Sequence, residues 1–219
     1  HEFMIRANGV ISRGMLHFHN WNLSDPDEFA QRVPFTENYI LNALGYLQGL
    51  PQFTRYHFVD YKKSIHRGIG LCGDHTMILS QILDNYDIEN NLVVFEQGHV
   101  VLEVKDKTLG TLVLDPDFGV YVNLNKMGIE DFEIMPLVLA AYSEAGYKQG
   151  DIDMIEHIYS GEQTLFPTVY SFMRMRYIFE PISYVLIWVL PLCLLVSVWL
   201  GNVTRVKRLF KPRHLSSLN

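Results

Sequence analysis

A glycine-rich stretch runs directly into a helical pattern in this sequence, and it reads Gly68-Ile69-Gly70-Leu71-Cys72-Gly73-Asp74-His75-Thr76-Met77-Ile78-Leu79. Three glycines within six residues do not suit the interior of a regular helix or strand, because glycine loses more backbone freedom on ordering than any other residue. From Cys72 onward, apolar residues recur at helical spacing, which predicts a helix over residues 72–86. We therefore expect Cys72 at the point where a glycine-rich loop enters a helix.

The expected position of Cys72 bears on its chemistry. The first amide groups of a helix have no acceptor within the helix, and the helix N-terminus carries partial positive charge. That environment favours the thiolate, which is the nucleophilic form of cysteine. The alternative interpretation is a small buried residue on a helix face, because free cysteines usually pack as small apolar side chains.

Two strands are predicted after this helix, over residues 92–96 and 99–104. In the second strand, His99, Val101 and Glu103 share one face because side chains alternate along a strand. The other face is wholly valine and leucine, so we expect it to serve the core and His99 to lie on the more polar face.

A further strand is predicted over residues 111–114, and it ends at Asp115 because Pro116 cannot donate to a sheet ladder. Cys72, His99 and Asp115 then follow the order nucleophile, base and orienting acid. In this scheme His99 accepts the thiol proton and Asp115 holds the imidazole tautomer. Taken singly, His99 and Asp115 would be read as a structural histidine and a turn residue, so the joint arrangement carries the prediction.

These segments resemble the core of the transglutaminase-like superfamily. The matching residues, which lie within about residues 35–122, are Gly70-Leu71-Cys72, then Gly98-His99-Val100-Val101-Leu102-Glu103-Val104, then Leu114-Asp115-Pro116. The resemblance implies an α+β fold with a papain-like core, in which the helix bearing the cysteine packs on an antiparallel sheet. It also implies Cys72 as nucleophile, His99 as base and Asp115 as orienting acid. The family usually has an aromatic residue after the histidine, often Trp, where this sequence has Val100.

The superfamily contains amide-crosslinking enzymes, peptidases, amidases and inactive members. The resemblance thus implies an enzyme that acts on an amide bond of a polypeptide or another substrate through a thioester. We favour hydrolysis over crosslinking because nothing in the sequence marks an amine-donor site. The alternative is an inactive module that binds a polypeptide or a membrane partner. For an enzyme, the oxyanion donors would be the Cys72 backbone N–H and one upstream side chain, with Gln48, Gln52 and Tyr56 as candidates.

A long apolar run lies near the C-terminus. Residues 181–204 contain no charged residue, and residues 182–200 are almost wholly apolar. A helix of this length can span a bilayer core of about 30 Å, whereas helices of soluble proteins are rarely apolar all round. We therefore predict a transmembrane helix over residues 181–204. A catalytic domain with flanking helices (4–160) and an aromatic juxtamembrane segment (161–180) precede it, and a basic tail (205–219) follows.

The distribution of charged residues changes at this apolar run. All 24 acidic residues and 13 of the 18 basic residues precede the apolar run. The other five basic residues follow it, and no acidic residue does. They are Arg205, Lys207, Arg208, Lys211 and Arg213. Basic residues beside a span mark its cytoplasmic end, so we interpret them as a topology signal and not as a nucleic-acid patch. The expected protein is single-pass, with its catalytic domain extracytoplasmic. Its partners are the bilayer and the substrate, with a membrane-protein partner left open.

The sequence has two cysteines, and Cys193 lies inside the apolar run, so we expect no structural disulfide with Cys72. Neither a metal-binding spacing nor a phosphate-loop pattern occurs, so we expect no metal and no cofactor. His17 and His19 alternate, and we read them as surface histidines and not as metal ligands.

Other expected elements are simpler. Residues 4–22 are expected to form a strand or an extended arm, and residues 24–28 to begin a helix. Helices are predicted over the ranges 36–48, 134–145 and 152–159.

Overall fold

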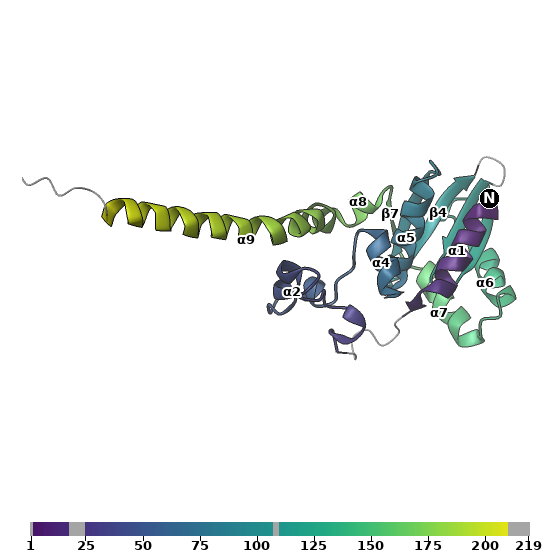
Figure 1. Cartoon of the computed structure of the whole chain (residues 1–219). Coiled ribbons are helices and arrows are strands. Elements are labelled where there is room, and N and C mark those ends of the chain that lie inside the picture. Colours follow the sequence, from purple (N-terminus) through teal and green to yellow (C-terminus); the bar gives the residue numbers. More distant parts are fainter. Residues whose placement is uncertain (1, 18–24, 107–109, 210–219) are drawn as a thin grey trace, which may run out of the picture.

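A computed structural model describes residues 2–17, 25–106 and 110–209 (Figure 1). Within them the protein is an α+β domain followed by one long apolar helix. The domain is built on a five-stranded sheet of order β6-β5-β4-β3-β7, in which every neighbouring pair is antiparallel. Its strands are β3 (Asn90–Phe95), β4 (Val100–Asp106), β5 (Gly110–Asp115), β6 (Val120–Asn125) and β7 (Gln163–Phe166). The three predicted strands correspond to β3, β4 and β5, whereas β6 and β7 were not predicted.

Helices cover both faces of this sheet. On one face lie α1 (Glu2–Gly14) and α5 (Cys72–Asp84), and on the other lie α6 (Met135–Glu144) and α7 (Gln149–Tyr159) (Figure 1). Alternation along β4 supplies both cores: Val100, Leu102 and Val104 pack toward α5, and Val101 packs toward α6 and α7. The more polar face of this strand is also buried, because a second helical layer covers it. His99 and Glu103 are accordingly buried.

The loop before α5 depends on two of its glycines. Gly68 has φ of +71° and ends α4 (Tyr61–Arg67) in the left-handed conformation, which glycine adopts without strain. At Gly70 an added Cβ would lie 2.6 Å from Cβ of Asp74, so only glycine allows that approach. Residues Ile69–Gly70 form β2, which pairs in parallel with β1 (Leu16–His17). The helix that follows begins at Cys72, as predicted, and ends at Asp84.

The N-terminal expectations were partly wrong. The segment expected to be extended is the helix α1, whose buried Met4 and Ile11 pack in the same core as α5. Residues 18–24, including His19 and the start of the helix expected over 24–28, lie outside the described residues. The next element is a short 3-10 helix, η1 (Glu28–Ala30). The helix predicted over 36–48 is shorter, α2 (Tyr39–Gly45), and α3 (Pro51–Thr54) follows it.

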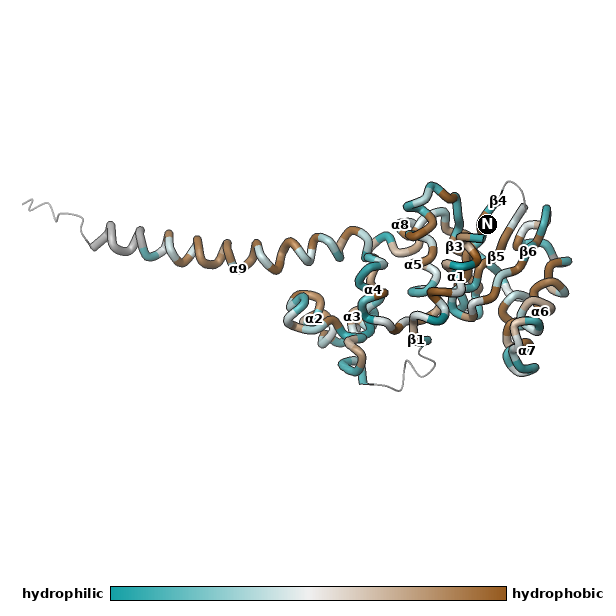
Figure 2. Tube along the Cα trace, turned by 45° about the vertical axis from the view of Figure 1, so that its right-hand side comes forward, coloured by the Kyte–Doolittle hydropathy of each residue, from teal (hydrophilic) through white to brown (hydrophobic). Residues whose placement is uncertain are grey.

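The C-terminal helix α9 (Arg174–Leu209) projects away from the domain, and much of it is hydrophobic (Figures 1 and 2). Its portion Arg174–Asn202 is long and apolar enough to cross a membrane. The residues expected to form a juxtamembrane segment, 161–180, contain β7, α8 (Val169–Phe172) and the start of α9. The end of the basic tail, residues 210–219, lies outside the described residues.

Candidate active site

Cys72 is the first residue of α5, at the end of the glycine-rich loop. The helix is fixed to the sheet one turn later, where the Thr76 hydroxyl donates to the Val100 carbonyl at 2.8 Å. The Cys72 Sγ lies 3.7 Å from the carbonyl oxygen of Gly98, in the turn between β3 and β4. The thiol is partly exposed, so the arrangement places it where a substrate can reach it.

The turn between β3 and β4 also positions His99. The amide of Phe95 donates to the His99 carbonyl at 2.9 Å, and Gly98 adopts a φ of +90°, which closes the turn. The His99 ring is 5% exposed, and its Nε2 lies 2.7 Å from Oδ2 of Asp115. The Cys72 thiol lies close enough to His99 to raise the pKa of the imidazole. Since Asp115 occupies Nε2, Nδ1 is the ring nitrogen left for the thiol.

Asp115 is the last residue of β5, and both of its carboxylate oxygens are engaged. Oδ1 accepts the backbone N–H groups of Asp117 at 3.0 Å and Phe118 at 3.1 Å, which forms a tight turn after the strand. Oδ2 accepts the hydroxyl of Tyr142 at 2.5 Å in addition to His99. The ring of Phe118 packs edge-on against His99, with centroids 5.6 Å apart. These contacts fix the carboxylate and the imidazole together.

The electrostatics of this pair follow from the contacts. Burial alone lowers the pKa of His99, but the charge of Asp115, its hydrogen bond and the contact with Cys72 raise that pKa well above the usual value. Burial alone raises the pKa of Asp115, but the charge and hydrogen bond of His99, with the Tyr142 and Phe118 bonds, lower it. For Tyr142, burial and the neighbouring Asp115 charge both raise the pKa, so its hydroxyl stays a donor. The site therefore favours an imidazolium paired with a carboxylate.

A second ionic cluster lies at the first turn of α5, close to Cys72 in the chain. Asp74 is fully buried, accepts the Leu71 N–H at 3.0 Å, and pairs with His57 at 2.8 Å and Arg67 at 3.6 Å. Burial raises the pKa of Asp74, but the charge and hydrogen bond of His57, then Arg67 and Leu71, lower it to about 2. These partners offset the charge that Asp74 would otherwise present to a thiolate at Cys72.

The structure thus brings Cys72, His99 and Asp115 together, as the sequence predicted. It separates Asp115 from the neighbouring Asp117, whose Oδ1 is paired with Nδ1 of His17. His17, which was expected to be a surface histidine, is partly exposed, and its side chain is held in this contact.

Sequence reasoning missed Tyr142, His57 and Arg67. Tyr142 lies on α6, beyond the last residue at which a local pattern pointed to the site. A tyrosine on the inward face of a helix needs a partner for its hydroxyl, but nothing local identifies that partner.

The three candidates for an oxyanion donor lie elsewhere. Gln48 and Gln52 are exposed residues around α3. Tyr56 is buried in a cluster separate from the one that Cys72 packs against, together with Val33, Leu41 and Phe58. Backbone N–H groups at the start of α5, where Cys72 itself lies, are the remaining candidate donors, because the first amides of a helix have no acceptor within it.

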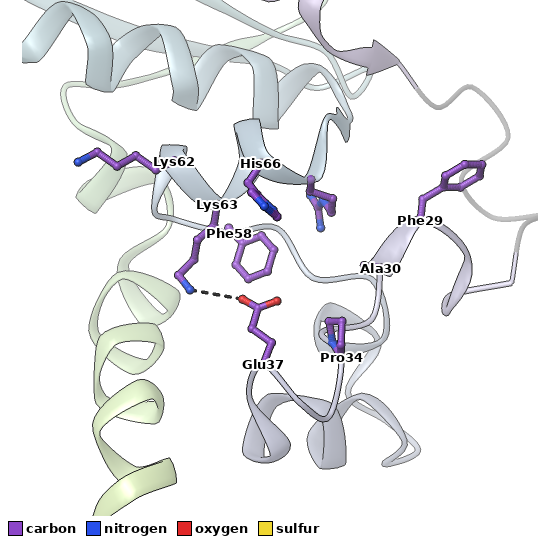
Figure 3. A pocket seen from close by; sticks show the side chains of 9 residues that line it. Phe29, Ala30, Pro34, Glu37, Phe58, Lys62, Lys63 and His66 are labelled. Carbon is purple, nitrogen blue, oxygen red and sulfur yellow. Dashed lines mark hydrogen bonds and ion pairs between the residues drawn. The ribbon is translucent and has the colours of Figure 1, made fainter.

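A cavity of about 770 Å³ is lined by residues of η1, of α4 and of the segment between them, and none of the triad residues lines it (Figure 3). Its walls combine apolar residues with a charged edge at which Lys63 pairs with Glu37 at 3.3 Å. No cysteine or serine is among its lining residues, so the chemistry of the site does not extend into it.

Within the described part of the chain, no three His, Cys, Asp or Glu residues are placed to hold a metal ion. Comparisons of the chain with protein-family models, with curated proteins and with solved structures found no significant match.

Proposed function

We propose that this protein is a membrane-anchored cysteine enzyme of the transglutaminase-like type, with a papain-like core, that acts on amide bonds. The single observation that carries the proposal is the placement of Cys72 beside a His99–Asp115 pair. It supports covalent catalysis because a thiol, a base and an orienting acid lie close together, with the base and the acid 2.7 Å apart. The substrate is a polypeptide or another molecule that contains an amide bond.

The first half of the reaction forms a thioester. The Cys72 thiolate attacks the amide carbonyl carbon, and the developing oxyanion is bound by backbone N–H groups at the start of α5. As the C–N bond breaks, the imidazolium of His99 donates its proton to the leaving amine. Asp115 keeps the ring oriented and stabilises its positive charge throughout.

The second half releases the acyl group. His99, now neutral, takes a proton from water, and the resulting hydroxide equivalent attacks the thioester carbonyl. The C–S bond breaks, the carboxylic acid leaves and Cys72 returns as a thiolate beside the imidazolium. An amine in place of water would give a new amide. We favour water because no site for an amine donor is marked on the chain.

The anchoring part of the proposal rests on α9, which is long and apolar enough to cross a membrane. The basic residues that follow the apolar run favour a cytoplasmic tail, which puts the catalytic domain on the extracytoplasmic side.

Alkylation of Cys72 tests the catalytic part. The detergent-solubilised chain is treated with iodoacetamide from pH 5 to 10, and the tryptic peptide 68–105, which holds Cys72 but not Cys193, is quantified by mass spectrometry. At pH 7 the wild type should be alkylated several-fold faster than His99→Ala, because the imidazolium of His99 stabilises the thiolate. The two rates should converge above about pH 8.5, where a free thiol ionises without help.

A matched control is His66→Ala, which removes an exposed histidine from α4 and should leave the curve unchanged. If wild type and His99→Ala give the same curve near pH 8.5, the chain is the inactive binding module and the proposed enzyme is wrong.

A further inference from the structure

A short uncharged segment beside the base of α9 exposes several large apolar side chains. We call residues 33–55, which contain α2 and α3, the α2–α3 lobe. Between Glu37 and Arg55 the lobe has no charged residue. Phe35 and Leu47 are nevertheless 69% and 53% exposed, whereas Tyr46, 62% exposed, lies under Arg32 and donates its hydroxyl to Asp27 at 3.4 Å. Single exposed apolar residues need no explanation, but large apolar side chains exposed on both sides of one short uncharged segment indicate an interaction surface.

The lobe is held against α9 by specific contacts. Asn38 donates to the Ser183 hydroxyl at 2.9 Å, and the Tyr39 hydroxyl donates to the Ile187 carbonyl at 3.4 Å. Figures 1 and 2 both place α2 beside the first turns of α9. The lobe therefore has a defined position along the candidate span.

That position is inside the apolar run. The portion Arg174–Asn202 has 29 residues, which is about 43 Å of helix, whereas the hydrocarbon core is about 30 Å thick. For a helix along the membrane normal and centred on the apolar run, the hydrocarbon boundary falls near Pro181. Ile187 then lies roughly 9 Å deeper, at a rise of about 1.5 Å per residue. A lobe that contacts Ile187 must therefore touch the bilayer.

One pair of opposite charges lies where the lobe meets α9. The Tyr184 hydroxyl donates to Glu37 at 2.5 Å, and Lys63 lies over the Tyr184 ring and pairs with Glu37. Tyr184 lies three residues before Ile187, so these two charges are close to the boundary near Pro181, and their pairing lowers the cost of placing charged groups there.

We propose that the α2–α3 lobe is a second membrane-contacting element, which inserts Phe35 and Leu47 into the lipid interface beside α9. The occupant of this surface is lipid, because the lobe contacts the apolar span itself at Ile187. Interfacial elements bury their apolar face about 5–10 Å into the headgroup and acyl boundary, which matches the depth set by Ile187. The inference rests on the proposed anchoring by α9. Two contacts would hold the catalytic domain in one orientation over the bilayer.

Photocrosslinking of lipid to the full chain tests this inference. The protein is reconstituted in phosphatidylcholine vesicles that contain a phosphatidylcholine with a diazirine in its acyl chain, irradiated and digested with trypsin. The lobe is one tryptic peptide, 33–55, and most of the span is another, 177–205. The peptide 127–148, which carries the exposed Leu137 on α6, is the control. We expect lipid adducts on 33–55 and 177–205 but not on 127–148.

A variant sharpens the test. Leu47→Glu changes an exposed side chain, so the fold should survive, and adducts on 33–55 should fall several-fold while those on 177–205 stay constant. Leu137→Glu should change neither. Adducts on 177–205 without adducts on 33–55, or equal labelling of 33–55 and 127–148, would overturn the inference. Absence of adducts from both 33–55 and 177–205 would instead remove the anchoring on which it rests.

Discussion

Asp115 is the most constrained side chain of the candidate site. One oxygen is fixed by the turn that Pro116 starts, and the other is shared between His99 and Tyr142. An acid that orients an imidazole must itself be held in one place. Asp117, two residues later, is engaged with His17 on the side of β1, so it does not compete for His99.

The hydroxyl of Tyr142 should therefore contribute measurably to stability. Tyr142→Phe keeps the ring but removes a donor to a buried carboxylate. A hydrogen bond to a charged group contributes about 1.5–3 kcal/mol, so the free energy of unfolding should fall by about that amount at pH 7. Urea unfolding of the domain in the detergent-solubilised chain measures this change.

Tyr147→Phe is the matched control for Tyr142→Phe. The Tyr147 hydroxyl donates at 2.5 Å to the Phe118 carbonyl, which is neutral, and Tyr147 is less buried. Its loss should cost less, about 0.5–1.5 kcal/mol. Equal losses in the two variants would mean that the carboxylate does not depend on Tyr142.

At the scale of elements, the helix that begins at Cys72 and the strands β3, β4 and β5 were predictable because their signals are local. The glycine loop, the helical spacing after it and the β-branched runs each lie within a few residues. The strand β7 was missed because it has four residues and pairs with β3, which lies far away in sequence. Such pairing leaves no local pattern.

The helix α1 was missed for a different reason. Its sequence contains Gly9 and Gly14 and β-branched residues such as Val10, all of which have weak helix propensity. Packing of Met4 and Ile11 against the core outweighs that local preference. The contact between Asp115 and Tyr142 was also beyond the sequence, since it depends on how α6 covers the sheet.

The start of α5 depends on the buried carboxylate of Asp74. Its folded pKa of about 2 is below the unfolded value of about 3.9, so its stabilising effect is present above about pH 4. This stabilisation is lost as the pH falls through about 2, and its size is about 2 kcal/mol. Asp74→Asn should therefore lower the free energy of unfolding at pH 5–7, and the difference from wild type should shrink as the pH approaches 2.

Urea unfolding of the domain at pH 7, 5, 3 and 2 measures this trend. Asp87→Asn, an exposed substitution in the turn after α5, should change little at any of these pH values. A difference between wild type and Asp74→Asn that does not depend on pH would contradict the role given to the charge.

At the scale of the whole molecule, the domain and α9 are joined firmly and not by a loose linker. Glu180, buried at the base of α9, accepts the backbone N–H groups of Val59 at 2.9 Å and Asp60 at 3.4 Å. Asn38 contacts Ser183 one turn further on. Val59 and Asp60 lead directly into α4 and the glycine loop. Any orientation that α9 takes in a membrane is therefore transmitted to Cys72.

The basic residues after the apolar run predict on which side of the membrane the domain lies. Five basic residues and no acidic residue follow the apolar run. Basic residues are retained on the cytoplasmic side of a span. We therefore expect residue 215, which lies outside the described residues, to be cytoplasmic, and the exposed Glu130 in the domain to be extracytoplasmic.

Single-cysteine variants can measure this arrangement. Leu215→Cys and Glu130→Cys are introduced separately after Cys72 and Cys193 are replaced, and intact cells are treated with a membrane-impermeant maleimide. Glu130→Cys should be labelled in intact cells, and Leu215→Cys only after permeabilisation, which also shows that its thiol is reactive. The opposite pattern would place the domain in the cytoplasm. The proposed substrates would then be cytoplasmic, and α9 would hold Cys72 over the inner surface of the membrane.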